Sequence, residues 1–171
     1  EYVYFSRPDS TLNGKLIYEV RKNFGRALAR ECPLKVDAVV PVPDTAFPVA
    51  LGYSEVSGIP VEMALVKNRY VHRTFIEPDQ KSRRNSVALK LIPLKETLKG
   101  KNIAVIDDSI VRGNTCRKLV KTLLKAGAKE VHFLVSSPPI RYPDFYGIDT
   151  PGQAELIASS KTVEEIRKFL G

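Results

Sequence analysis

The feature that most constrains this fold is a segment in which a compact apolar strand runs into a helix. Residues 101–108 read KNIAVIDD, a short apolar run that ends in two carboxylates and predicts a buried strand. From Arg112 to Ala126, leucine and valine residues share one face at helical spacing, and Gly127 ends the pattern. A strand followed directly by a helix is the unit from which α/β domains are built.

Similar signals occur along the rest of the chain. They predict strands over 2–5, 37–43, 60–65 and 131–135, helices over 16–28 and 46–57, and a last helix that begins at a Thr162–Glu165 capping box. The alternation predicts an α/β domain with a mostly parallel central sheet flanked by helices, whose ligands bind beyond the carboxyl ends of the strands. A length of 171 residues predicts a single domain, 1–171.

The net charge of +8 indicates an anionic partner, either a nucleic acid, a membrane surface or a phosphorylated small molecule. Seven basic and two acidic residues between positions 67 and 90 contribute +5 of this charge. The same stretch has little periodicity, which predicts a lid or binding loop over about 67–91. No apolar run approaches the ~20 residues of a membrane span, and two cysteines cannot form a disulfide framework, so we expect a cytoplasmic protein.

The segment IAVIDDSIVRGNT, residues 103–115, carries the strongest chemical signal. Asp107 and Asp108 stand at the end of a strand, and both can serve one ligand only if the strand breaks into a loop there. Gly113 permits unusual backbone angles, and the helix start behind it offers unpaired N–H groups to a phosphate. Carboxylates beside such a loop would suit a sugar phosphate, although acidic residues before a helix also occur simply as caps.

This segment resembles the ribose-phosphate signature of type I phosphoribosyltransferases, and further motifs make the resemblance closer. EYVYFSRPDS, PVPDTA, KNRYVHRTFI, VIDDSIVRGNT, SSPPI and FYGIDTP are similar to stretches of the glutamine phosphoribosylpyrophosphate (PRPP) amidotransferases, in that family's order. The resemblance covers nearly the whole chain. It implies the type I phosphoribosyltransferase fold with a flexible lid loop.

The resemblance also implies roles for individual positions. Asp107 and Asp108 would bind the ribose hydroxyls beside a Mg²⁺ ion that bridges the diol and the pyrophosphate. The 5′-phosphate loop would comprise Ser109 to Thr115, with Arg112, Gly113, Asn114 and Thr115 closest to the phosphate. The remaining implied PRPP contacts are a pyrophosphate loop of Asp44, Thr45 and Ala46, and the lid residues Lys67, Tyr70, Arg73 and Lys90.

The activity implied is displacement of pyrophosphate from PRPP by ammonia to give phosphoribosylamine, the first committed step of purine synthesis. Cationic side chains would assist the leaving pyrophosphate, and Arg73 and Lys90 are the candidates for this catalytic role. The family also implies a homo-oligomer inhibited by purine nucleotides, with no nucleic-acid or membrane partner. Two other interpretations stay open: a PRPP-responsive regulator or nucleic-acid binder on the same scaffold, and a phosphoribosyltransferase that accepts a nucleobase.

Several positions depart from the family pattern. Ala46 replaces a hydroxyl residue, and His72 replaces a glycine. The chain starts at Glu1, near the family's junction between halves, so we expect that the N-terminal glutaminase half is missing and that this chain cannot hydrolyse glutamine. Asp144 stands where some members have a cluster cysteine, so we expect no iron–sulfur cluster.

Overall fold

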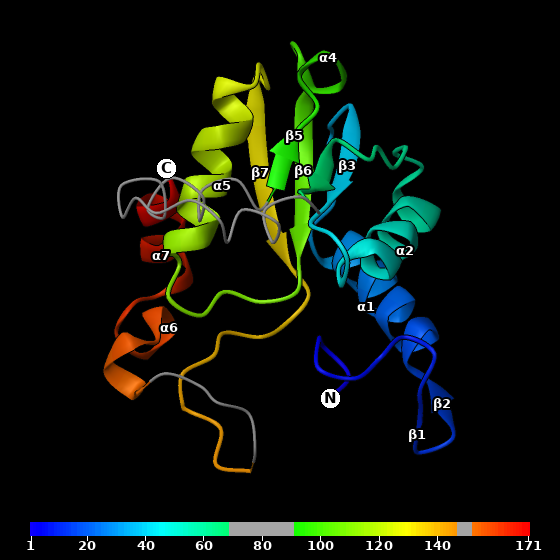
Figure 1. Ribbon diagram of the computed structural model, residues 1–171, viewed down its shortest axis with the longest axis vertical. Coiled ribbons are helices and arrows are strands. Elements are labelled where there is room, and N and C mark those ends of the chain that lie inside the picture. The colour runs from blue at the N-terminus through cyan, green and yellow to red at the C-terminus, as the bar shows by residue number, and fades with distance from the viewer. Residues whose placement is uncertain (69–90, 147–151) are drawn as a thin grey trace, which may run out of the picture.

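The computed structural model describes residues 1–68, 91–146 and 152–171 of the chain (Figure 1). Its strands are short, and its two longest helices are α1 and α5. The elements in chain order are β1 (Thr11–Leu12), β2 (Lys15–Leu16), α1 (Ile17–Glu31), β3 (Ala38–Pro41), α2 (Phe47–Ser57), β4 (Leu65–Lys67), β5 (Leu91–Pro93), α4 (Lys95–Leu98), β6 (Asn102–Asp107), α5 (Asn114–Lys125), β7 (Glu130–Val135), η3 (Gln153–Glu155), α6 (Ile157–Ser160) and α7 (Val163–Leu170).

The central sheet has the strand order β3-β6-β7, and all three strands are parallel. Val105 of β6 pairs with Val40 of β3 on one side and with Phe133 of β7 on the other. The middle four residues of β6 are fully buried, because a parallel strand between helical layers presents apolar side chains to both faces. The predicted parallel sheet is therefore confirmed, and the carboxyl ends of its strands meet at one edge, the lower edge in Figure 1.

Helices cover both faces of this sheet (Figure 1). Val39, Ala104 and Ile106 face one side, where they pack with residues of α1 and α2. The alternate positions, such as Val40 and Val105, face the other side and pack with α5. Neighbouring strand residues point to opposite faces, so each strand contributes to both layers of the core.

Helices α1 and α2 approach each other closely because two glycines leave room at their contact. A Cβ atom added at Gly25 would lie 1.9 Å from the carbonyl oxygen of Val49, and one added at Gly52 would lie 1.9 Å from that of Lys22. The backbones thus touch where side chains would otherwise separate them. This contact fixes the position of α2, which follows β3 in the chain after the predicted pyrophosphate loop, residues 44–46.

Two strand predictions were wrong. Residues 2–5 form turns, because the buried guanidinium of Arg21 binds the carbonyl oxygens of Tyr2 and Ser6 at 2.9 and 2.8 Å and folds the segment back. Over 60–65 the backbone makes only an isolated bridge through Val61, and the strand β4 begins at the end of this range, where it pairs antiparallel with β5. The residue types in these two stretches are typical of strands, but Tyr4, Phe5 and Met63 are exposed, and over 60–64 only Val61 bridges another strand, at Val39 of β3.

The predicted helices over 16–28 and 46–57 correspond to α1 and α2. Helix α2 ends at Gly58, whose φ of 72° only glycine adopts readily. The last helix, α7, begins at Thr162 with both hydrogen bonds of the predicted capping box. No helix among the described residues is long and apolar enough to span a bilayer.

Candidate functional site

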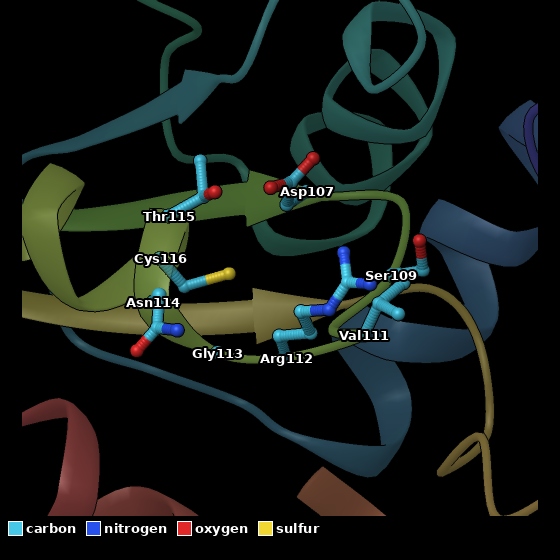
Figure 2. A pocket seen from close by; sticks show the side chains of 8 residues that line it. All are labelled: Asp107, Ser109, Val111, Arg112, Gly113, Asn114, Thr115 and Cys116. Carbon is cyan, nitrogen blue, oxygen red and sulfur yellow. The ribbon is translucent and has the colours of Figure 1, made fainter. Parts of the chain in front are cut away.

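The segment 107–116 forms a cavity at the carboxyl edge of the sheet, where β6 ends and α5 begins (Figure 2). The cavity has a volume of about 260 Å³, and the strand end and the first turn of the helix face each other across it. Its lining residues are Asp107, Ser109, Val111, Arg112, Gly113, Asn114, Thr115 and Cys116. Six of the eight are residues that the sequence predicted individually for PRPP binding; Val111 lies within the predicted 5′-phosphate loop, and Cys116 was not predicted.

The acidic pair lies where the strand breaks into a loop. Asp107 is the last residue of β6, and its Oδ1 accepts a hydrogen bond from the backbone N–H of Asp108 at 2.9 Å. The carboxylate of Asp108 accepts a bond from the Ser109 hydroxyl at 2.6 Å. Asp107 lines the cavity whereas Asp108 does not, so the structure brings only one of the two predicted carboxylates to its wall.

The environment of Asp107 disfavours a negative charge. Burial, followed by the charge of Asp108, raises the pKa of this carboxyl to about 7, and the bond from the Asp108 N–H offsets only part of the effect. No cationic side chain among the described residues forms an ion pair with Asp107. A ligand that donates hydrogen bonds or brings positive charge would therefore stabilise the ionised form.

The thiol of Cys116 lines the cavity but is not a nucleophile. It is buried at the start of α5, and burial followed by the charge of Asp107 raises its pKa to about 12. Because a thiolate is the reactive form of cysteine, this side chain stays protonated and inert at neutral pH. Cys116 lies one turn into the predicted helix, so helix geometry alone could have indicated that it lines the site.

The loop before α5 is shaped to present backbone amides. Gly113 caps the helix with a φ of 76°, in the left-handed region that favours glycine. The first intrahelical bond is that of the Arg117 N–H to the Gly113 carbonyl, at 2.9 Å. The amides of Asn114, Thr115 and Cys116 therefore have no partner within the helix, and the helix dipole adds positive potential at the same point. Such a terminus binds a phosphate group.

The guanidinium of Arg112, a predicted phosphate contact, is held at the rim of the cavity. Its Nε donates a hydrogen bond to Oε2 of Glu155 at 2.9 Å, and its Nη2 lies 2.9 Å from the same oxygen in an ion pair. Sequence reasoning missed Glu155, which lies 43 positions along the chain from Arg112 in the short helix η3. No spacing in the sequence connects these two residues.

The predicted pyrophosphate loop follows β3 and therefore shares the same edge of the sheet. The peptide bond between Pro43 and Asp44 is cis, and exposed Asp44 forms an ion pair with Lys67 at the end of β4. Ala46 is fully buried against the core, so it can offer only backbone groups to a ligand. Asp44, Thr45, Ala46 and Lys67 do not line the cavity of Asp107.

The other predicted lid residues, Tyr70, Arg73 and Lys90, lie outside the described residues, as does His72. The predicted lid itself, about 67–91, is described only at its two ends. Within residues 1–68, 91–146 and 152–171, no group of three or more His, Cys, Asp or Glu side chains is arranged to hold a metal ion.

Comparison with known proteins gives one consistent result. The profile of the family described as phosphoribosyl transferase domain matches residues 12–142. Amidophosphoribosyltransferases from Synechococcus elongatus and Bacillus subtilis are 54% and 52% identical to this sequence, each over 171 residues. Those alignments include all of this chain but only 35% and 36% of the respective relatives, so the chain spans about a third of their length.

Solved structures agree with the sequence comparison. The B. subtilis glutamine PRPP amidotransferase complexed with ADP and GMP superposes with a TM-score of 0.89 at 52% identity. The match covers 99% of this chain and 37% of that one. A structure described as the allosteric regulatory enzyme of purine biosynthesis matches with the same TM-score at 51% identity.

Proposed function

Because this chain belongs to the phosphoribosyl transferase domain family, we propose that it is the phosphoribosyltransferase half of an amidophosphoribosyltransferase and binds PRPP at the end of β6. One observation carries the proposal. A single cavity joins the Asp107 carboxylate, which accepts hydrogen bonds, to the amide-rich start of α5, which donates them. A ribose 5-phosphate presents hydroxyl donors at one end and an anionic acceptor at the other, so it complements both walls.

The 5′-phosphate would bind at the start of α5. The unpartnered amides of Asn114 and Thr115 and the Thr115 hydroxyl supply donors, and the helix dipole favours the negative charge. Ser109, Gly113 and Arg112 complete this loop. Because the amide donors belong to the backbone of a fixed helix end, they need little reorganisation on binding.

The ribose hydroxyls would donate to the carboxylates of Asp107 and Asp108. Asp107 already lines the cavity. Asp108 follows it directly, and the Ser109 hydroxyl binds its Oδ1, so Oδ2 is the oxygen that would accept from the diol. The hydroxyl donors would also offset the unfavourable charge at Asp107.

Pyrophosphate would lie beside the loop after β3, on the backbone of Asp44, Thr45 and Ala46. Lys67 supplies a cation there, at present paired with Asp44. The lid residues Tyr70, Arg73 and Lys90 would close over PRPP, with Arg73 and Lys90 acting on the leaving pyrophosphate. A closed lid keeps water, the competing nucleophile, away from the anomeric carbon.

Asp107 and Asp108 would also hold Mg²⁺, because carboxylate oxygens are ligands that this ion prefers. The donor set fits, since two adjacent carboxylates end β6 and no cationic side chain of the described residues forms an ion pair with Asp107. Bound Mg²⁺ would supply charge neutralisation for the leaving pyrophosphate. The two cysteines lie in different core clusters and give no support to an iron–sulfur cluster in this chain.

In the proposed reaction the bond between the anomeric carbon and the pyrophosphate oxygen breaks, and a bond to ammonia forms. The nitrogen then loses a proton to give phosphoribosylamine. The chain contributes binding and orientation, and the pyrophosphate carries away the electron pair of the broken bond. No side-chain nucleophile takes part, in keeping with the protonated Cys116 in the cavity wall.

The wider context follows from the relatives. In a complete enzyme a glutaminase domain would supply the ammonia, the product would enter purine synthesis in the cytoplasm, and the subunits would form a homo-oligomer. One structural relative was solved with ADP and GMP, so purine nucleotides are the proposed inhibitors.

The direct test mixes the chain with PRPP, Mg²⁺ and ammonium at alkaline pH and measures pyrophosphate release. Release that depends on ammonium supports the proposal. PRPP binding without release would contradict catalysis by this chain, whereas release that requires a nucleobase would identify a different acceptor.

A further inference from the structure

The C-terminal segment of the chain packs against the predicted 5′-phosphate loop, residues 109–115. We define this C-terminal brace as residues 153–170, which comprise η3, α6 and α7. The backbone N–H of Ile157 donates to the carbonyl oxygen of Val111 at 2.9 Å. Ile157 and Phe169 fill the space beside Gly113, where an added Cβ would lie 2.8 and 3.1 Å from their side chains. The backbone of the loop is thus fixed by packing and by a hydrogen bond.

One contact of the brace is polar and reaches the cavity itself. Glu155 binds Arg112 through its Nε and Nη2 atoms. The Nη1 edge of the guanidinium takes no part in this contact and can bind a ligand. We propose that Glu155 is a positioning residue that holds Arg112 so that this remaining edge faces the 5′-phosphate. The inference rests on the proposed function and deepens it, because it assigns a role at the phosphate end of the site to a residue outside every recognised motif.

The exposure of the pair argues that its role is orientation rather than stability. The side chains of Arg112 and Glu155 are 53% and 55% exposed. Ion pairs this exposed contribute little to folding, so loss of the pair leaves the fold intact. A free arginine side chain has many rotamers, and a pre-oriented one loses less entropy when the phosphate binds.

A carboxylate at this position has two possible roles, which have opposite effects on phosphate binding. If Glu155 competes with the phosphate for Arg112, its removal tightens binding of the phosphate. If Glu155 positions Arg112, its removal weakens that binding. The two roles therefore predict changes of opposite sign in the same dissociation constant.

The experiment measures dissociation constants of PRPP, ribose 5-phosphate and Mg²⁺-pyrophosphate by titration calorimetry, for the full chain and for Glu155→Gln. Glu164→Gln is the matched control, because Glu164 pairs only with Arg167 within α7 among the described contacts. We expect Glu155→Gln to weaken PRPP and ribose 5-phosphate about two- to five-fold, the size of one exposed charge-assisted contact. Pyrophosphate affinity stays unchanged, because that ligand does not reach the loop before α5.

A double-variant arm separates positioning from a general structural effect. In an Arg112→Gln background, Glu155→Gln should cause no further loss, because Glu155 acts only through Arg112. Unchanged or tighter ribose 5-phosphate binding in the single variant overturns the inference, as does an equal loss in the Arg112→Gln background or an equal loss for pyrophosphate. A wild-type chain that binds neither PRPP nor ribose 5-phosphate overturns the proposed function itself.

Discussion

Replacing Asp107 by Asn should make the ligand-free protein more stable at alkaline pH. Burial and the neighbouring Asp108 raise the pKa of Asp107 from 3.8 to about 7, so the folded protein holds this proton more tightly than the unfolded chain. Stability therefore falls as pH rises between about 4 and 7, and the cost is fully present above pH 7. Asn keeps the acceptor for the Asp108 N–H but carries no charge, so it escapes this cost.

The size of the effect follows from the same two pKa values. Their difference of about 3 corresponds to about 4 kcal/mol, at about 1.4 kcal/mol per pKa unit. At pH 4 the two proteins should unfold at nearly the same urea concentration. At pH 8 the Asn variant should exceed the wild type by about 4 kcal/mol in the free energy of unfolding. The same variant should lose PRPP binding, as expected where a site is built at the expense of stability.

Urea unfolding of both proteins at several pH values between 4 and 8 provides the assay. Asp108→Asn is the control, because it removes the smaller cause of the shift and leaves burial, the larger one. Its stability should still fall with pH, with a smaller slope than that of the wild type. A difference between wild type and Asp107→Asn that does not change with pH would refute the description of this carboxyl as buried and uncompensated.

Three further substitutions test the packing around the site. Gly113→Ala places a methyl group against Ile157 at a positive φ, so urea unfolding should show a loss of about 1–3 kcal/mol, together with weaker ribose 5-phosphate binding by calorimetry. Gly25→Ala would force the backbones of α1 and α2 apart at Val49 and should cost about 3 kcal/mol; an unchanged melting temperature would contradict the close contact. Thr162→Ala removes the capping box of α7 and should cost about 1 kcal/mol in urea unfolding, whereas Thr162→Ser should restore most of the loss.

Local signals in the sequence were sufficient for most of the core. The strand at 102–107, the helix behind it and the capping box at Thr162 each depend on residues near one another in the chain, and each was predicted. The turn at 1–6 was not predicted, because it depends on Arg21, a buried cation in a distant helix. The antiparallel pair β4 and β5 also joins segments far apart in sequence.

The site shows the same division between local and distant contacts. The residues that line the cavity all come from the single stretch Asp107 to Cys116, so its motif was visible in the sequence. Glu155 contacts Arg112 only because the C-terminal brace packs against the 5′-phosphate loop, and no pattern in the sequence indicates that these two residues meet. The roles of Arg73 and Lys90 stay predictions, because they lie outside the described residues.

A crystal structure of the chain soaked with PRPP and Mg²⁺ tests the central claim most directly. We expect the ribose hydroxyls to donate to the carboxylates of Asp107 and Asp108, and the 5′-phosphate to accept from the amides of Asn114 and Thr115. A sugar bound at any other edge of the sheet, or a phosphate away from the start of α5, would contradict it.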